Sequence, residues 1–227
     1  MSNELIHDIE DSIRQERLRA LWKEYAPYIF GGILIAIVLT GVTTTYRSWD
    51  AKQNAQSTAI LLQAMENDGN VAQLLSEAAA QLRPNHRALA YLSEAGIHLR
   101  DGNRSEALDV FKTAEADKKL PRLYHDLATL QAIRIEWSTK AEGVTTDDLL
   151  ARLKPIAQRK NSPWHGQALI QSALIKAHDN NDYAGARADL KTIIESDKFT
   201  DPIKTRAASL DQIFALKNSA EAPKESE

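Results

Sequence analysis

The sequence predicts an all-α protein in which a single N-terminal transmembrane helix is followed by an α-solenoid of paired helices. Three observations support this prediction. Glycine (9), proline (7) and aromatic residues (6%) are scarce among the 227 residues, whereas alanine and leucine are abundant, a composition that favours helices over strands. Residues 28–46 form a long apolar segment without a charge. Beyond that segment, prolines recur about forty residues apart, which is the length of a helix pair.

Composition and charge exclude several classes of function. The formal net charge is −3, from 28 Lys+Arg against 31 Asp+Glu, and no basic stripe of the kind that binds nucleic acid is present. With 43% hydrophobic and 26% charged residues, the sequence does not have the composition of a wholly disordered chain. Because cysteine is absent, thiol catalysis, disulfide bonds and cysteine-ligated metals are excluded.

The first predicted element is an amphipathic helix within a cytoplasmic segment, residues 1–27. Apolar residues recur on one face of this helix at Leu5, Ile6, Ile9 and Ile13. Two interpretations remain open. The helix either rests on the inner leaflet of the membrane or docks a cytosolic or membrane partner.

The second predicted element is the membrane anchor, residues 28–46. As a helix it would extend roughly 28 Å, close to the hydrocarbon thickness of a bilayer. Tyr28 and Tyr46 mark its edges, as in an aromatic belt. The apolar segment begins too late, and lacks a small-x-small cleavage site, for a signal peptide. The alternative is a buried core helix of a soluble protein, but such helices seldom run this long without a charge.

Flanking positive charges predict the orientation of the anchor. Four basic residues precede it and two closely follow it: Arg14, Arg17, Arg19 and Lys23, then Arg47 and Lys52. Since cytoplasmic flanks carry the excess of Lys and Arg, we expect the N-terminus in the cytoplasm. The larger C-terminal part would then lie across the membrane.

The remaining chain is predicted to be a domain of helix pairs, residues 47–217, followed by a disordered polar tail, residues 218–227. A proline precedes each of four apolar-periodic stretches, a position that suits the first helical turn: Pro84, Pro121, Pro163 and Pro202. Two further predicted helices, residues 49–66 and 71–83, extend the stack at its N-terminal end. The alternative for this domain is a non-repetitive helical bundle.

Residues 91–111 carry the pattern of a tetratricopeptide repeat. Tyr91 is followed by the small Ala95, an Asp-Gly-Asn turn, and then Ala107 and Phe111 on a second helix. The pattern recurs more loosely in two later pairs, at Tyr124, Ala128, Leu149 and Leu153, and at Ile170, Leu174, Ala186 and Leu190. A helix pair cannot bury its apolar face alone, so stacked neighbours and a closing helix over residues 202–216 are expected.

No arrangement of residues for catalysis is recognisable. The six histidines form no His-x-x-x-His pair, and neither a nucleophile elbow nor a phosphate-binding glycine motif occurs. The sequence therefore predicts a protein that is not an enzyme and binds no cofactor or metal. Function would then depend on the surface of the helical array. We expect its concave face to bind partner polypeptides through six residues: Leu89, Leu92, Leu99, His125, Gln171 and Ile175. Alternatively, the leucines pack against a neighbouring helix.

This layout resembles the YfgM family of bacterial inner-membrane proteins. The resemblance rests on the short N-terminal segment, the anchor with a Gly-Gly start, Arg47-Ser-Trp49 at its outer end, and the degenerate repeats. It implies an ancillary, chaperone-like subunit of the Sec translocon that binds partners or emerging periplasmic substrates. It also implies partnership with a membrane-anchored prolyl-isomerase-type chaperone. The alternative is a periplasmic scaffold for another cell-envelope complex, in division or wall synthesis.

Overall fold

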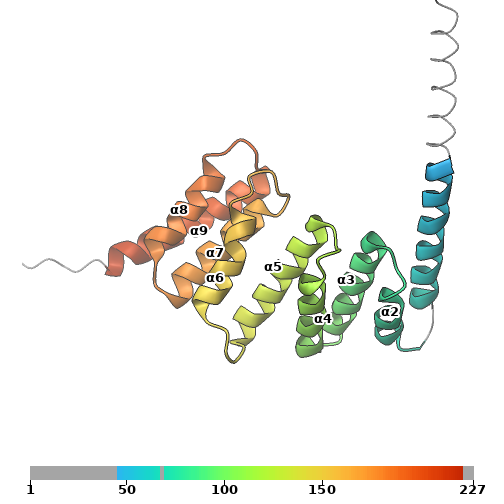
Figure 1. Ribbon diagram of the computed structural model, residues 1–227. Helices are drawn as coiled ribbons and strands as arrows, with labels where there is room; N and C mark the ends of the chain where they lie inside the picture. The colour runs from blue at the N-terminus through green and yellow to red at the C-terminus, as the bar shows by residue number, and fades with distance from the viewer. Residues whose placement is uncertain (1–44, 67–68, 222–227) are drawn as a thin grey trace, which may run out of the picture. The chain divides into compact units, whose positions relative to one another are not determined.

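The computed structural model describes residues 45–66 and 69–221, and every regular element in these ranges is an α-helix (Figure 1). The predicted all-α class is therefore confirmed for the described part of the chain. The predicted cytoplasmic segment, residues 1–27, and the predicted anchor, residues 28–46 apart from its last two, lie outside the described residues. Among the helices that are described, none combines the length and the apolar character needed to cross a bilayer.

The chain divides into two compact units, Met1–Gln56 and Ser57–Glu227. The described part of the first unit is the beginning of a helix over residues 45–66, which continues into the second unit. Tyr46 and Trp49 are exposed there, with ring centroids 6.4 Å apart, and the Asn54 amide donates a hydrogen bond to Asp50.

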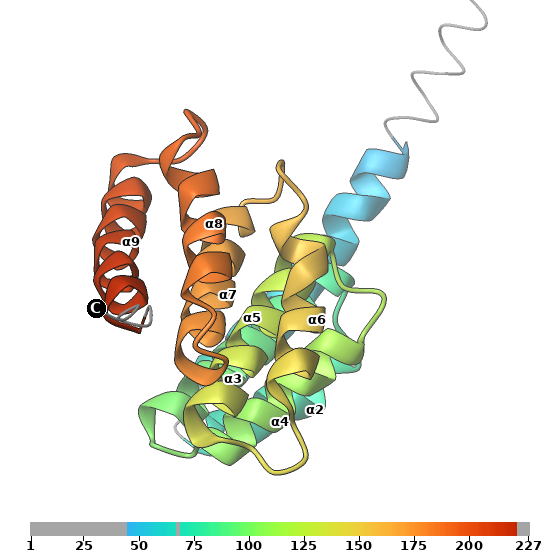
Figure 2. The ribbon, with the colours of Figure 1, turned by 90° about the vertical axis from the view of Figure 1, so that its left-hand side faces the viewer.

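In the second unit, the helices follow one another in sequence order, and each packs mainly on the next (Figures 1 and 2). We call the helix 45–66, α3, α5 and α7 the A helices, and α2, α4, α6 and α8 the B helices. Successive A helices also touch at α3–α5 and α5–α7, an arrangement consistent with an α-solenoid. The bounds are α2 (Val71–Ala79), α3 (Pro84–Arg100), α4 (Arg104–Ala116), α5 (Arg122–Thr139), α6 (Thr146–Ala157), α7 (His165–Asp179), α8 (Tyr183–Ile194) and α9 (Asp201–Glu221).

Local sequence signals account for several helix ends. Pro84 occupies the first turn of α3, where its missing N–H costs nothing. The start of α6 is a capping box, in which the Asp148 N–H donates to Thr145 Oγ1 (3.2 Å) and the Thr145 N–H donates to the Asp148 carboxylate (3.0 Å). Gly102, at φ 83°, supplies the left-handed residue of the turn between α3 and α4.

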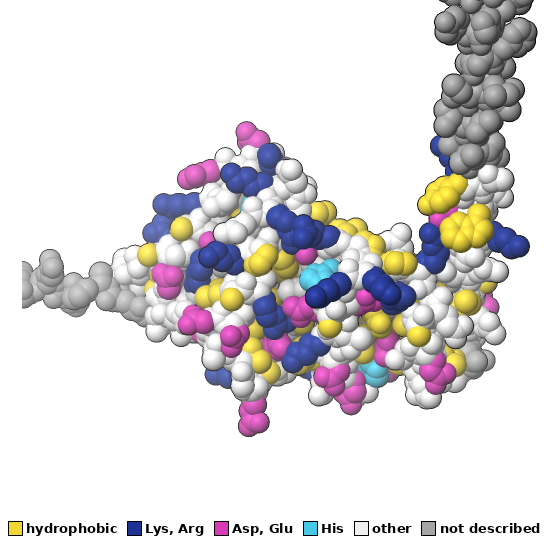
Figure 3. Space-filling model, in the orientation of Figure 1, with side chains coloured by type: hydrophobic (Ala, Val, Ile, Leu, Met, Phe, Trp, Pro, Cys, Tyr) yellow, Lys and Arg dark blue, Asp and Glu magenta, His cyan; other side chains and the backbone are white. Residues whose placement is uncertain are grey.

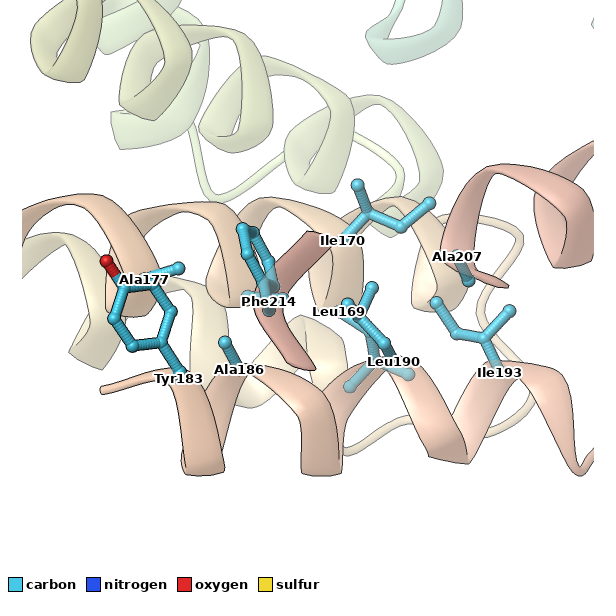
Figure 4. Packing of buried hydrophobic residues seen from close by; sticks show 10 residues of the cluster. Leu169, Ile170, Ala177, Tyr183, Ala186, Leu190, Ile193, Ala207 and Phe214 are labelled. Carbon is cyan, nitrogen blue, oxygen red and sulfur yellow. The ribbon is translucent and has the colours of Figure 1, made fainter. Parts of the chain in front are cut away.

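The core runs along the second unit as a chain of apolar clusters, each shared by consecutive helices. The first lies between the helix 45–66, α2 and α3, the second between α3, α4 and α5, and the third between α5, α6 and α7. In the last, side chains of α7, α8 and α9 interdigitate around Leu190 and Phe214 (Figure 4). Fully buried alanines, including Ala95 and Ala107, allow the paired backbones to approach closely.

Ion pairs join successive helices around this core. Arg87 on α3 contacts Asp117 after α4 (2.9 Å) and donates to the carbonyl of Leu82 (3.0 Å). Lys176 on α7 pairs with Asp189 on α8 (2.7 Å). Further along the chain, Arg187 on α8 pairs with Asp211 on α9 (2.8 Å). The closing helix α9 continues to Glu221, so the described chain is still helical in the first part of the segment 218–227 that the sequence predicted as a disordered tail.

Candidate functional site

The exposed side of α3 carries two of the leucines predicted to bind partners. Ala90 belongs to the cluster shared with the preceding helices, and Ala95 to the cluster shared with α4 and α5. Between these two covered sides, Leu89 is 41% exposed and Leu99 is 39% exposed. Leu92 is half-buried, because it packs against the cluster of α3, α4 and α5. Leu92 thus also serves the packing role that the sequence left open.

The helix 45–66 extends this exposed apolar surface. Leu62 is 50% exposed and Met65 is 49% exposed, while Leu61 and Ala64 face the core. A 2.9 Å hydrogen bond between Thr58 Oγ1 and His86 Nε2 aligns this helix with the start of α3.

The periodicity of a helix places Leu62 and Met65 one and two turns beyond Thr58 on the same side. Leu89 lies one turn beyond His86, so Leu62, Met65 and Leu89 flank one seam, and Leu99 lies farther round the exposed side of α3. We call the exposed side that carries Leu62, Met65, Leu89 and Leu99 the A face.

On α5, an exposed leucine lies two residues before the predicted surface residue His125. Leu123 is 43% exposed, and its carbonyl accepts a hydrogen bond from Trp164 Nε1 (2.8 Å) at the start of α7. His125 lies two residues later and therefore points to nearly the opposite side of the helix. Asp126, about one turn beyond Leu123 on the same side of α5, is buried and forms an ion pair with Arg159 after α6 (2.6 Å). The side chain of His125 is 37% exposed and lies 3.8 Å from the Asp126 carboxylate, so its role in binding stays a prediction, and Leu123 is the exposed apolar residue of α5.

On α7, two predicted surface residues are buried. Ile175 is 0% exposed and packs in the cluster between α5, α6 and α7. Gln171 is 7% exposed and donates to the Leu130 carbonyl (3.3 Å), which ties α7 to α5. The expectation that both line an accessible face is wrong, because α7 is covered on two sides by separate clusters. Gln167, His178 and Asp179 are the exposed residues of this helix instead.

Sequence reasoning assigned no surface role to several exposed apolar residues, which are Leu62, Met65 and Leu123 and, on α9, Ile213 and Leu216. The helix containing Leu62 and Met65 was predicted to continue the anchor, and no surface role was assigned to it. The sequence carried a signal for Leu62 and Met65, because both lie outside the stripe of Leu61 and Ala64 that packs on α2 and α3. Leu123 would have been predicted only if the exposed stripe of α5 had been placed two residues earlier, at Leu123 in place of His125.

The A face is suited to bury apolar side chains of another polypeptide. Its four defining residues carry no charge, and the charged residues next to Leu99, Arg100 and Asp101, form an exposed ion pair of their own (2.9 Å). Full burial of one leucine-sized side chain is worth about 1.5–3 kcal/mol. By contrast, acidic and basic side chains are interspersed on the face of the second unit seen in Figure 3, with apolar ones scattered among them. Comparisons of the chain with protein-family models, with curated proteins and with solved structures gave no match.

Proposed function

We propose that this chain is a non-catalytic, single-pass protein of the bacterial inner membrane whose periplasmic helical array binds polypeptide segments beside the Sec translocon. The proposal takes the array as a tetratricopeptide-like α-solenoid. The observation that carries it is the A face, where two neighbouring A helices expose Leu62, Met65, Leu89 and Leu99. Exposed apolar side chains grouped over adjacent elements favour a partner-binding surface over a merely solvated one.

The proposed membrane anchor and its orientation rest on the sequence. The uncharged segment 28–46 and the excess of basic residues before it support an anchor with the N-terminus in the cytoplasm. The Sec translocon and the prolyl-isomerase-type chaperone enter through the resemblance to the YfgM family. On this basis the array would receive emerging periplasmic substrates.

Topology gives the first test of the proposal. A reporter that is active only in the periplasm should be active when fused after Glu227 and silent when fused before Asn3. The reverse result would refute the orientation, and with it a periplasmic role for the array.

Site-specific photo-crosslinking in cells tests the binding surface. A photoreactive amino acid at Leu99, on the A face, should capture translocon subunits, the chaperone or newly exported chains. The matched control is Asp109, which is exposed on α4. Equal capture from both positions would refute a binding role for the A face. Capture of division or wall-synthesis proteins alone would assign the array to another envelope complex.

A further inference from the structure

A separate candidate site lies where α5 and α7 end and α6 begins. It is a cleft of about 410 Å³, and none of the four residues that define the A face lines it. The loops after α5 and after α7 lie at the same end of the helices in both ribbon views (Figures 1 and 2). The lining residues that matter most below are Glu136, Trp137, Lys140, Thr146, His178 and Asp179.

The carboxylate of Asp179 is held in place by neutral donors. Trp137 Nε1 and Thr146 Oγ1 both donate to Asp179 Oδ2, each at 3.1 Å. Within residues 45–66 and 69–221, Asp179 forms no ion pair and its Oδ1 accepts no hydrogen bond. Asp179 is also the last residue of α7, where the helix dipole disfavours a negative charge. The cleft thus presents an oriented carboxylate whose charge the described residues leave without a partner.

The other charges around the cleft favour a cation with one exception. Glu136 adds little, since its buried carboxylate already binds Lys112 and Arg152. The last turns of α5 and α7 both contribute the partial negative charge of a helix C-terminus. The opposite partial charge at the start of α6 is balanced by the two aspartates of its first turn. Lys140 is the exception: it lines the cleft, is exposed, and pairs with no carboxylate in the described part of the chain.

Aromatic and apolar side chains complete the lining. The centroid of the Trp137 ring lies 6.0 Å from that of the exposed His178, and His178 meets Phe214 edge-on with centroids 6.4 Å apart. Val144 and Leu149 add apolar surface. Because a planar cation can pair with a carboxylate and lie against an aromatic ring at the same time, this combination favours a guanidinium.

We propose that this cleft binds the guanidinium group of an arginine side chain on another polypeptide. The guanidinium donates to Oδ1 of Asp179 and lies against the Trp137 ring, while its aliphatic stem covers Val144 and Leu149. Lysine fits less well, because its ammonium is a compact, strongly hydrated charge without a planar face. The site does not depend on the A face, so it stands whether or not the A face binds partners.

Titration of the purified full-length chain, labelled with ¹⁵N-tryptophan, with the tripeptide acetyl-Gly-Arg-Gly-amide tests the site. We expect the indole signal of Trp137 to shift saturably. The signal of Trp164 should stay unchanged, since its indole N–H donates to the Leu123 carbonyl outside the cleft. The matched probe carries citrulline, which has nearly the shape of arginine without its charge. It should bind at least about tenfold more weakly, the usual scale for losing one charge-assisted hydrogen bond.

Two substitutions separate a charge contact from a structural role of Asp179. Asp179→Asn keeps an oxygen that can accept from Trp137 and Thr146, so unfolding in urea should change little, whereas binding should weaken at least about tenfold. Lys140→Gln removes the opposing cation and should strengthen binding about two- to fivefold, the scale of an exposed charge pair. Lys154→Gln is the matched control, because Lys154 is exposed on α6 outside the cleft and should leave the affinity unchanged.

The proposal is overturned if the Trp137 signal does not shift saturably, if the citrulline peptide binds as well as the arginine peptide, or if Asp179→Asn keeps the wild-type affinity. Should Asp179→Asn unfold the chain, the citrulline comparison on the wild type decides. Equal affinity for the corresponding lysine peptide would refute the choice of arginine. Tighter binding of spermidine than of the arginine peptide would assign the cleft to a free polyamine and refute a polypeptide ligand.

Discussion

Arg152 on α6 holds the buried carboxylate of Glu136 on α5, and the same guanidinium also binds Glu115 on α4 (2.7 Å). The Glu136 side chain is 1% exposed and receives a second cation, Lys112, at 3.0 Å. Hydrogen bonds to both carboxylates outweigh burial and raise the pKa of Arg152 above its usual value, so the group stays charged. A single side chain thus fixes three consecutive helices beside the cluster of α5, α6 and α7.

Replacing Arg152 by Met should therefore destabilise the fold strongly. The change leaves Glu136 buried with Lys112 as its remaining partner, and removing one member of a buried ion pair costs about 3–5 kcal/mol. The remaining ion pair with Lys112 should keep this loss of stability near the lower end of that range. Urea unfolding of the purified chain, followed by circular dichroism, measures the loss. Arg134→Met is the control, because Arg134 is exposed on α5 and should change the free energy of unfolding by less than about 0.5 kcal/mol. Equal effects of the two changes would mean that the Arg152 ion pairs contribute nothing to stability.

Substitutions on the A face should weaken binding of a partner without unfolding the chain. Leu89→Ser with Leu99→Ser removes two exposed apolar residues, so the free energy of unfolding should fall by less than about 1 kcal/mol in total. Ile175→Ser changes a fully buried residue and should cost about 2–5 kcal/mol, the range of large-to-small core substitutions. The same unfolding measurement compares them. If the double leucine variant unfolds as readily as Ile175→Ser, those leucines are structural and the A face is not a free surface.

The contrast between Leu89 and Ile175 also marks how far the sequence could predict this protein. Helix pairs were predictable because Pro84 and the Ala95–Ala107–Phe111 pattern encode local geometry. Leu89 and Leu99 are exposed on α3, whereas the sequence left open that they pack against a neighbouring helix, and their role in binding stays a prediction.

Ile175 was misplaced for a physical reason. Helix α7 is apolar on most of its circumference, because clusters shared with α5 and α6 on one side and with α8 and α9 on the other both cover it. Periodicity alone does not determine which stripe of such a helix stays open.

Ala95 should tolerate no larger side chain. It is 0% exposed and shares a cluster with Ala107 and Phe111, so Ala95→Leu would overpack the contact and cost about 1–3 kcal/mol. The adjacent Gly96 offers a matched control, since a Cβ added there meets no atom within 4 Å. Gly96→Ala should instead stabilise the chain by about 0.5–1 kcal/mol through helix propensity. A melting temperature that stays unchanged in Ala95→Leu would contradict the close approach of α3 and α4.

Gly166 should behave in the opposite way to Gly96, although both lie in helices. A Cβ at Gly166 would lie 2.9 Å from Phe199 Cε1, so the ring that stacks on His165 must move. Gly166→Ala should therefore lose stability despite its better helix propensity. In the Phe199→Ala background the clash is absent, and the same change should become stabilising. A double-mutant cycle on unfolding free energies measures this reversal, and an unchanged sign would remove Phe199 as the cause.

Glu94 should make stability depend on pH. It is 6% exposed on α3, and burial raises its pKa above 4.5, against the opposing effects of a Ser76 hydrogen bond and the charge of His98. Between the unfolded and the raised folded pKa, the folded state binds more protons, so the free energy of unfolding falls as pH rises through this window. The unfavourable contribution of the buried carboxylate is therefore largest above this window and disappears below the ordinary pKa of a glutamate, where both states bind the proton. Glu94→Gln should thus raise the free energy of unfolding at pH 7 and have a smaller effect at pH 4.

Glu142→Gln, at an exposed loop position, is the control and should show no such difference between the two pH values. If Glu94→Gln raises the free energy of unfolding equally at both pH values, the amide packs better for reasons unrelated to charge.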